Sequence, residues 1–346
     1  MSHALRIGVI GAGGNTRAKH IPGLQAIPGV AVTAVCNRTR ESGEKVAKEF
    51  GIPTVADNWQ QIVESPEIDA ICIGTWPNLH AKLTVAALRA GKHVLTEARM
   101  ARNLAEAELM LAESTLRPKL VAQIVPAPMS LPFDATVGEI LAAGKLGVLR
   151  EVVMVCTNGA LADPTAPLSW RQDYALSGKN TLMLGIYYEM VLRWLQRDPF
   201  SLVASSAVFT KERKDAEGLP QPGLIPESLG VLAQYPDGCR MIGHFSGVEM
   251  CTPRQEIRLN GTKGALRLDL ARGELWLATG GSLAPEKPVT IDPAKRGAWR
   301  VEADFVESIR EKKPVRLTDF TTGVAYMRFT EAVWESWNND NARVTL

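Results

Sequence analysis

The sequence predicts an α/β protein of two parts: an N-terminal doubly wound parallel sheet, and a C-terminal α+β part with a large, mostly antiparallel open sheet. Over residues 1–125, short apolar runs alternate with amphipathic stretches, as in parallel sheets with helical crossovers. After Pro126 and Pro128 the chain changes to strand-like runs separated by turn sequences. The length of 346 residues also exceeds what a single core usually sustains, about 250–300 residues.

The elements of the first part follow from hydrophobic periodicity and from end signals. Clusters of apolar residues predict strands at residues 5–11, 30–37, 70–75, 93–97 and 120–125. Helices are predicted at about 41–50, at 79–90 before a capping Gly91, and from Asn103, which forms a capping box with Glu106. A helix should also follow residue 16, but Pro22 removes a backbone bond there, so we expect it to be kinked or to start late.

The second part begins, in our prediction, at residue 126. Helices are predicted at about 133–144 and 184–196, and a strand at 148–159. From Leu202 onward, strand-like runs are joined by Asp237-Gly238 and by the Gly-Thr-Lys-Gly sequence at 261–264, which are typical of hairpin turns. Helices at 301–312 and 321–338 follow, and they could pack back on the first part.

The composition excludes several classes of protein. Apolar residues make up 46% and charged residues 22%, and the formal charge of +2 gives no electrostatic reason to expect nucleic acid or an anionic membrane as a partner. No apolar stretch approaches about 18 residues, and the N-terminus leads directly into a strand. We therefore expect neither a signal peptide nor a membrane span, and a cytoplasmic location.

The cysteines and histidines show no metal-binding pattern. The cysteines, at positions 36, 72, 156, 239 and 251, have no CxxC pair, and His3, His20, His93 and His244 form no cluster with carboxylates in the sequence. We expect neither a disulfide nor a metal site.

A glycine-rich turn follows the first strand. Gly11 and Gly13 match a dinucleotide-binding turn, in which one glycine makes the tight turn and the next lets a pyrophosphate approach the backbone at a helix N-terminus. Thr16 stands at the third glycine position, so a plain strand-to-helix turn is the alternative. Because the turn opens the chain and a second strand ends at the expected distance, we predict a dinucleotide site.

The end of the second strand bears on the choice of cofactor. An NAD site normally has an acidic residue there, which accepts a hydrogen bond from the ribose 2′-hydroxyl. This chain has Asn37, followed by Arg38 and Arg40. A neutral residue with arginines suits a 2′-phosphate, although a solvated basic turn would look the same. We expect NADP or NAD, with a weak preference for NADP.

Five further segments complete a family pattern: residues 8–14 (GVIGAGG), residues 75–94 with the following Glu97, residues 142–152 (AAGKLGVLREV), residues 185–195 (GIYYEMVLRWL) and residues 259–269 (LNGTKGALRLD). Together they resemble the glucose–fructose oxidoreductase / inositol dehydrogenase / rhizopine-catabolism (Gfo/Idh/MocA) family over essentially the whole chain. The resemblance implies a Rossmann domain at 1–125 and a substrate-binding and oligomerisation domain at 126–346. It also implies a sugar or cyclitol substrate and a homo-oligomer, dimer or tetramer, formed through the C-terminal sheet.

The family's catalytic residues are replaced. Its Glu-Lys-Pro motif is Glu97-Ala98-Arg99 here, so Ala98 stands at the lysine position. Its helical His and Asp correspond to Tyr187 and Met190. Oxidising an alcohol by hydride transfer also requires removal of its hydroxyl proton, and a positioned acid or base is worth roughly 10²–10⁴ in rate. The usual mechanism therefore does not transfer.

Other residues could supply the acid–base step of the reaction. Tyr187 occupies the family's histidine position, and a nearby cation, Arg99 or Lys179, would favour its phenolate; an aromatic pocket wall is the alternative. Arg99 could clamp a substrate or form a surface salt bridge. Glu189 is predicted to pair with Arg193 at i, i+4 rather than to act as a base.

The candidate residues form three sets, with no metal ligands. Some members of these sets also have a structural interpretation. His80 could stabilise a turn, Glu97 could form a backbone cap, and the loop at 169–174 could serve packing. The catalytic set is Tyr187 and Arg99; the cofactor set is Gly11, Gly13, Gly14, Asn15, Thr16, Asn37, Arg38, Thr75, Trp76, Pro77, Asn78, His80 and Glu97; the substrate set is Arg99, Trp170, Arg171, Lys179, Tyr187 and Tyr188.

Three functions remain open. The first is an NAD(P)-dependent oxidoreductase acting on a sugar, cyclitol or related hydroxyl compound. The second is an enzyme that cleaves or isomerises glycosides through transient oxidation, and the third is a non-catalytic nucleotide-binding sensor or regulator.

Overall fold

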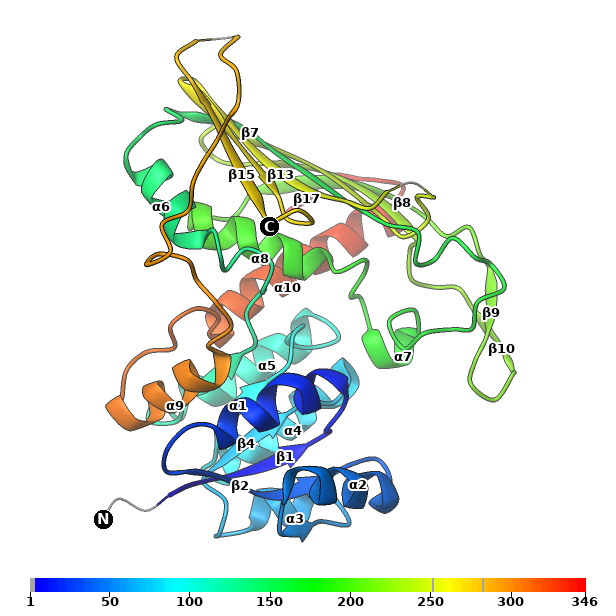
Figure 1. Ribbon diagram of the computed structural model, residues 1–346. Coiled ribbons are helices and arrows are strands. Elements are labelled where there is room, and N and C mark those ends of the chain that lie inside the picture. Colours follow the sequence, from blue (N-terminus) through cyan, green and yellow to red (C-terminus); the bar gives the residue numbers. More distant parts are fainter. Residues whose placement is uncertain (1–3, 251, 282) are drawn as a thin grey trace. The chain divides into compact units, whose positions relative to one another are not determined.

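The computed structural model describes residues 4–250, 252–281 and 283–346 (Figure 1). The chain forms two compact units, which are described separately. The first comprises Met1–Pro126, Ala175–Gly178 and Arg300–Met327, and the second comprises Ala127–Tyr174, Lys179–Trp299 and Arg328–Leu346.

The first unit contains a parallel sheet with strand order β3-β2-β1-β4-β5-β6. Every neighbouring pair is parallel, which confirms the predicted doubly wound sheet. Ile7, Val9, Ile71 and Val94 are fully buried, as expected for strands covered on both faces. The carboxyl ends of the strands therefore lie along one edge. The strands are β1 (Leu5–Ile10), β2 (Val30–Cys36), β3 (Thr54–Val55), β4 (Ala70–Ile73), β5 (His93–Thr96) and β6 (Ala122–Ile124).

The helices of this unit begin where the sequence signals them. At the start of α5 the Asn103 side chain accepts from the Glu106 N–H at 2.9 Å, which confirms the predicted cap. The chain after the glycine turn forms a short π-helix, η1, which gives way to α1 with Pro22 in its first turn, where a missing N–H costs nothing. The helices are η1 (Thr16–His20), α1 (Ile21–Gln25), α2 (Arg40–Phe50), α3 (Trp59–Glu64), α4 (Pro77–Arg89), α5 (Leu104–Thr115) and α9 (Val301–Glu311).

Residues from late in the sequence complete the first unit. The Ile124 N–H donates to the Thr318 carbonyl at 2.9 Å, and Gln123 forms an isolated bridge with Asp319, so the edge strand β6 is paired. The Tyr326 hydroxyl accepts from the Met100 N–H at 2.6 Å. Tyr326 lies on α10 (Phe320–Asn338), whose residues after Met327 belong to the second unit.

The second unit contains a large sheet with strand order β16-β15-β14-β13-β7-β12-β11-β8-β17. Neighbouring strands are antiparallel except β7 and β12, which confirms the mostly antiparallel prediction. The predicted turns at 237–238 and 261–264 join β11 to β12 and β13 to β14 as hairpins. The strands are β7 (Leu149–Thr157), β8 (Ser201–Ala207), β11 (Ser228–Gln234), β12 (Arg240–Ser246), β13 (Arg254–Gly261), β14 (Gly264–Asp269), β15 (Glu274–Thr279), β16 (Lys287–Pro288) and β17 (Val344–Thr345).

The remaining elements of this unit are helices and a separate two-stranded sheet. Helix α8 is buried along most of its length, and Tyr188 stacks on Phe329 of α10 with ring centroids 3.8 Å apart. No helix in the described ranges is long and apolar enough to cross a bilayer. These elements are α6 (Asp134–Ala142), α8 (Leu184–Leu195), β9 (Glu212–Lys214) and β10 (Pro220–Pro222). Helix α7 (Tyr174–Ser177) begins at the last residue of the stretch Ala127–Tyr174, and its residues Ala175–Ser177 belong to the first unit.

Candidate functional site

The glycine turn after β1 is shaped for a ligand. Gly11 has φ +85°, and a Cβ there would lie 2.6 Å from the Thr75 side chain, so the turn itself requires this glycine. At Gly13 the nearest atom to an added Cβ would be 3.8 Å away, and at Gly14 nothing among the described residues lies within 4 Å. Packing therefore does not demand glycine at these two positions, whereas a diphosphate that approaches the backbone does.

Thr16 departs from the usual glycine, and its partner explains how it fits. The third glycine of such a turn normally permits close contact between the helix and the sheet. Here the sheet supplies the glycine instead of the helix, as Gly74 directly after β4. A Cβ at Gly74 would lie 2.0 Å from the Thr16 hydroxyl oxygen. Thr16 itself is buried and donates to the Gly11 carbonyl at 3.2 Å.

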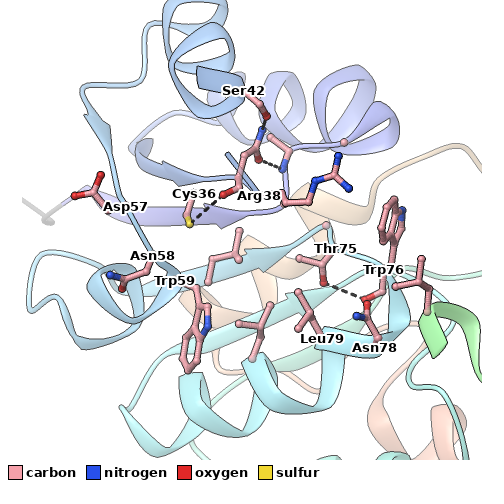
Figure 2. Close-up of a pocket in the computed structure, with 18 residues that line it drawn as sticks. Cys36, Arg38, Ser42, Asp57, Asn58, Trp59, Thr75, Trp76, Asn78 and Leu79 are labelled. Atoms are coloured by element: carbon pink, nitrogen blue, oxygen red, sulfur yellow. Dashed lines mark hydrogen bonds between the residues drawn. The ribbon is translucent and has the colours of Figure 1, made fainter. Parts of the chain in front are cut away.

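A pocket of about 810 Å³ opens at the carboxyl ends of β1, β2 and β4, within the first unit. Its volume lies within the range of about 300–1,000 Å³ usual for small-molecule sites. Figure 2 shows Thr75, Trp76 and Asn78 on one side and Arg38 and Ser42 on the other. The predicted cofactor residues that line it are Gly11, Gly13, Asn37, Arg38, Thr75, Trp76 and Asn78; Gly14, Asn15, Thr16, Pro77, His80 and Glu97 are not among its lining residues.

The Asn37 side chain makes two hydrogen bonds at the end of β2. Its side-chain oxygen accepts from the Ala12 N–H at 2.7 Å, and its amide donates to the Ser42 hydroxyl at 2.7 Å. Asn37 thereby ties the glycine turn to α2. Arg40 is paired with Glu44 and Asp57, whereas the Arg38 guanidinium lies 5.9 Å from the centre of the Trp76 ring. Of the two arginines, Arg38 is the one that lines the pocket.

Sequence reasoning missed part of the pocket wall. Asp57, Asn58 and Trp59 line it from the junction of β3 and α3, two short elements without a clear periodic signal. Leu176 comes from the segment Ala175–Gly178, which belongs to the first unit. The absence of a Cβ at Gly178 lets this segment lie close to Arg102, because a Cβ there would be 2.3 Å from the Arg102 carbonyl oxygen.

Three charged side chains, His20, Glu97 and Glu302, form a cluster at the end of β5. His20 is fully buried; its Nδ1 lies 2.5 Å from Glu302 Oε1 and its Nε2 lies 3.0 Å from Glu97 Oε1. The Asn15 amide also donates to Glu97 Oε1, at 2.5 Å. The expectation that His20 forms no cluster with carboxylates is therefore wrong, because the partners are distant in sequence. Among the described residues, no group of three or more His, Cys, Asp or Glu side chains is arranged so that it could hold a metal ion.

The environment sets the ionisation of this cluster. Burial lowers the pKa of His20, but the hydrogen bonds with Glu302 and Glu97 outweigh it and raise the pKa to about 9. Burial raises the pKa of Glu97, yet His20 and Asn15 outweigh burial and lower it overall. At neutral pH, a histidinium and an ionised Glu97 face one another.

His80 has the geometry of a turn-stabilising residue. It is fully buried, with Nδ1 3.0 Å from the Arg99 carbonyl oxygen and Nε2 3.0 Å from the Thr75 carbonyl oxygen. Burial lowers its pKa, so the imidazole is neutral and donates to one of these carbonyls. His80 therefore joins the loop after β4 to the loop after β5. Arg99 lies in that second loop and is buried, and the Ala98–Arg99 peptide is cis.

Tyr187 lies on α8 in the second unit and is 5% exposed. Its ring centroid lies 6.0 Å from that of Phe245. Burial raises the pKa of its phenol well above the usual value, and Cys156 adds to the shift. The phenol is therefore neutral at pH 7, which opposes a role as base.

The other substrate candidates are held by their neighbours. Tyr188 donates to Asp198 at 2.6 Å, and Lys179 pairs with Glu331. The Arg171 guanidinium lies 4.2 Å from the centre of the Trp170 ring, a cation–π contact.

The Glu189–Arg193 ion pair, at 2.7 Å, is confirmed. Cys36, Cys72, Cys156 and Cys239 are buried free thiols, and Cys251 lies outside the described residues.

Comparison with known proteins agrees with this geometry. Residues 5–122 match the model of an oxidoreductase family with an NAD-binding Rossmann fold, and residues 135–267 match the GFO/IDH/MocA C-terminal domain. An uncharacterized oxidoreductase from Rhizobium meliloti is 25% identical over 342 residues, covering 97% of this chain and 98% of the relative. Levoglucosan dehydrogenase from Pseudarthrobacter phenanthrenivorans is 27% identical over 326 residues, covering 87% and 82%.

Solved structures share the fold. An oxidoreductase domain protein from Kribbella flavida superposes with a TM-score of 0.89 at 23% identity, covering 99% of both chains. A levoglucosan dehydrogenase in complex with NADH and L-sorbose gives a TM-score of 0.87 at 21% identity, covering 99% of this chain and 98% of the other. With both family models matched along the chain, the protein belongs to the GFO/IDH/MocA family of oxidoreductases with an NAD-binding Rossmann fold.

Proposed function

We propose that the protein transfers a hydride between a nicotinamide cofactor and a sugar, cyclitol or related hydroxyl compound. The observation that carries the proposal is the glycine turn: Gly13 and Gly14 leave space that packing does not use, and Gly11 and Gly13 line the 810 Å³ pocket. A bound nicotinamide dinucleotide supplies the hydride exchange. The relatives named levoglucosan dehydrogenase and dTDP-3,4-didehydro-2,6-dideoxy-alpha-D-glucose 3-reductase support a sugar-like substrate.

We assign the proton chemistry to Tyr187 and, as a separate role, the holding of a polar substrate group to Arg99. Because its phenol stays neutral at pH 7, Tyr187 is suited to donating a hydrogen bond or a proton to the substrate oxygen when a carbonyl is reduced. Arg99 carries a fixed charge that can hold a polar substrate group. Trp170 and Arg171 provide a stacked surface for a ring.

The test of activity is a panel of sugars, cyclitols and their keto forms, followed at the absorbance of the reduced nicotinamide. Tyr187→Phe should lower kcat at least about tenfold if the phenol moves a proton. Tyr235→Phe removes a hydroxyl from another buried tyrosine and is the matched control. Unchanged kinetics in Tyr187→Phe would reduce that side chain to a packing residue of α8.

We propose NADP as the preferred cofactor. Support comes from Asn37 in place of an acidic residue, and from Arg38, which lines the pocket near Trp76. Arg38→Ala should weaken NADPH binding about tenfold while changing NADH binding little, since a charged hydrogen bond is worth roughly 1.5–3 kcal/mol. Asn37→Asp keeps the acceptor for Ala12 and adds a charge that repels a 2′-phosphate. Tighter binding of NADH than NADPH by the native protein would overturn the preference.

We also propose a cytoplasmic homo-oligomer formed through the sheet of the second unit. Leu232 on β11 is 49% exposed, and Glu256 on β13 forms ion pairs with Arg258 of the same strand and with Arg267 of the neighbouring β14. Light scattering after gel filtration measures the mass, and Leu232→Asp should dissociate the assembly. A monomeric native protein would refute this interface.

The same assays separate the competing functions. Turnover of a glycoside without net cofactor reduction indicates cleavage or isomerisation through transient oxidation. Cofactor binding without turnover of any compound indicates a sensor, which the replacements Ala98, Tyr187 and Met190 favour.

A further inference from the structure

The Glu97 carboxylate presents two unequal oxygens. Oε1 accepts from the Asn15 amide at 2.5 Å and lies 3.0 Å from His20 Nε2. Within the described residues, Oε2 has no such partner, and the side chain keeps 16% of its exposure. Oε1 is therefore anchored inside the unit, and Oε2 is the oxygen left to meet a ligand.

The anchor depends on the charge of His20. Both of its ring nitrogens face carboxylate oxygens, and an imidazole can donate from both nitrogens only as the cation. His20 is fully buried, and a buried cation is tolerated when carboxylates pair with it. Glu302 on α9 provides the second carboxylate, with its side chain 5% exposed.

Two further titratable groups lie close to the cluster, and neither carries a positive charge. Cys72 on β4 faces both carboxylates, and burial raises the pKa of its thiol well above the usual value, so it is neutral. His80 on α4 is neutral because burial lowers its pKa, and Asn15 carries no charge. Without the His20 cation, Glu97 and Glu302 would share this space as like charges.

We infer that His20 is a positioning residue for cofactor binding: held by Glu302, it anchors Glu97 Oε1 so that Oε2 is aimed at a hydroxyl of the nicotinamide ribose. The inference rests on the proposed function, and it takes Glu97 from the cofactor set predicted from the sequence. His20 touches neither cofactor nor substrate and acts through Glu97. Glu302 and α9, from late in the sequence, thereby become part of the cofactor site.

A pH signature distinguishes this role from simple packing. The proton shared by the cluster leaves as pH rises through the raised His20 pKa, about 9. Above that pH one anchor bond is lost and the two carboxylates repel. The dissociation constants of NADH and NADPH should therefore be constant between pH 6.5 and 8 and increase above pH 9.

The experiment is a fluorescence titration of the full chain with NADH and with NADPH from pH 6.5 to 10. His20→Asn should weaken binding about tenfold at pH 7, the worth of one charged hydrogen bond, and its affinity should no longer depend on pH in this range. Its KM for the cofactor should rise more than its kcat falls. Lys19→Ala, an exposed cation on the same turn, is the control and should match the native protein.

Glu302→Gln is the second variant, and it keeps an acceptor of the same shape. It removes one of the two carboxylates that raise the His20 pKa, so the loss of affinity should begin at a lower pH than in the native protein. This variant keeps the test decisive if His20→Asn does not fold, as judged by circular dichroism and thermal unfolding.

The outcomes separate the two proposals. If Glu97→Gln weakens cofactor binding but His20→Asn and Glu302→Gln keep the native affinity and pH profile, the inference is wrong and the proposed function stands. If Glu97→Gln has no effect while the native protein binds cofactor, the inference fails at the ribose contact. If the native protein binds neither NADH nor NADPH, the proposed function fails first.

Discussion

The two units use their buried charges differently. In the first, His20, Glu97 and Glu302 form a cluster in which one carboxylate oxygen, Glu97 Oε2, is left for a ligand. In the second, Glu189 and Arg193 on α8 pair with each other and with groups of the same unit. Arg193 also forms an ion pair with Asp134 at 2.5 Å, and Glu189 accepts from the Ala127 N–H at 3.1 Å.

The difference separates cofactor chemistry from acid–base chemistry. The first unit keeps a histidinium, His20, with a pKa of about 9, beside an ionised Glu97, whereas α8 offers a buried neutral phenol, Tyr187, and charges already paired for packing. We therefore expect cofactor binding to follow the family pattern more closely than proton transfer does.

Arg193→Met should produce the largest effect, on stability in the second unit. The substitution would remove the cation paired with Glu189, which is fully buried. Breaking a buried ion pair by removing one partner lowers the free energy of unfolding by about 3–5 kcal/mol. Chemical denaturation measures this loss. Lys45→Met removes an exposed partner of Glu41, and its midpoint should stay at the native value. A small loss in Arg193→Met would mean that α8 is not held by this pair.

The apo protein should lose stability at alkaline pH through the cluster of the first unit. The folded-state pKa of His20, about 9, lies above its ordinary value of 6.5, so its contribution is complete below pH 6.5 and is lost as pH rises through 9. That shift corresponds to roughly 3 kcal/mol. Urea unfolding at pH 6.5 and 9.5 should show a larger drop in the native protein than in His20→Asn, in which other titrating groups remain. Equal drops would mean that His20 is not charged in the folded state.

The glycine turn allows a matched pair of substitutions. Gly11→Ala has to place a Cβ against Thr75 at a positive φ, and should lower both stability and cofactor affinity, the latter about 100-fold, since such strain costs of order 1–3 kcal/mol before any ligand contact is lost. Gly14→Ala has open space around its Cβ, so its stability should be native while its cofactor affinity falls less. If Gly14→Ala also destabilises the apo protein, the open space at this turn has been misjudged.

The fold was predictable because its signals are local. The periodicity of the strands, the Asn103 cap and the two hairpin turns each depend on a few adjacent residues, and all of them are confirmed. The two-residue strand β3 and the short α3 were missed because so few residues carry no periodicity. The sequence also left open which unit the last helices join.

The site was only partly predictable, because its polar contacts are long-range. The glycine turn and Asn37 could be placed from spacing, and they line the pocket. His20 and Glu302 are 282 positions apart, and Leu176 reaches the pocket from another segment, so no local pattern indicates either. The turn-stabilising role of His80 was foreseen from the sequence, and its burial and two backbone carbonyl partners agree with it.

The segment Arg300–Met327, which closes the first unit, has a consequence for biosynthesis. When the ribosome has released Pro126, strand β6 still lacks its partner at Asp319, and His20 still lacks Glu302. At about 5–20 residues per second, these partners follow on the order of ten seconds or more later. During synthesis, residues 1–126 therefore remain an incomplete folding intermediate until the later segment is made. An N-terminal fragment that ends at Pro126 should not bind a nicotinamide cofactor by itself.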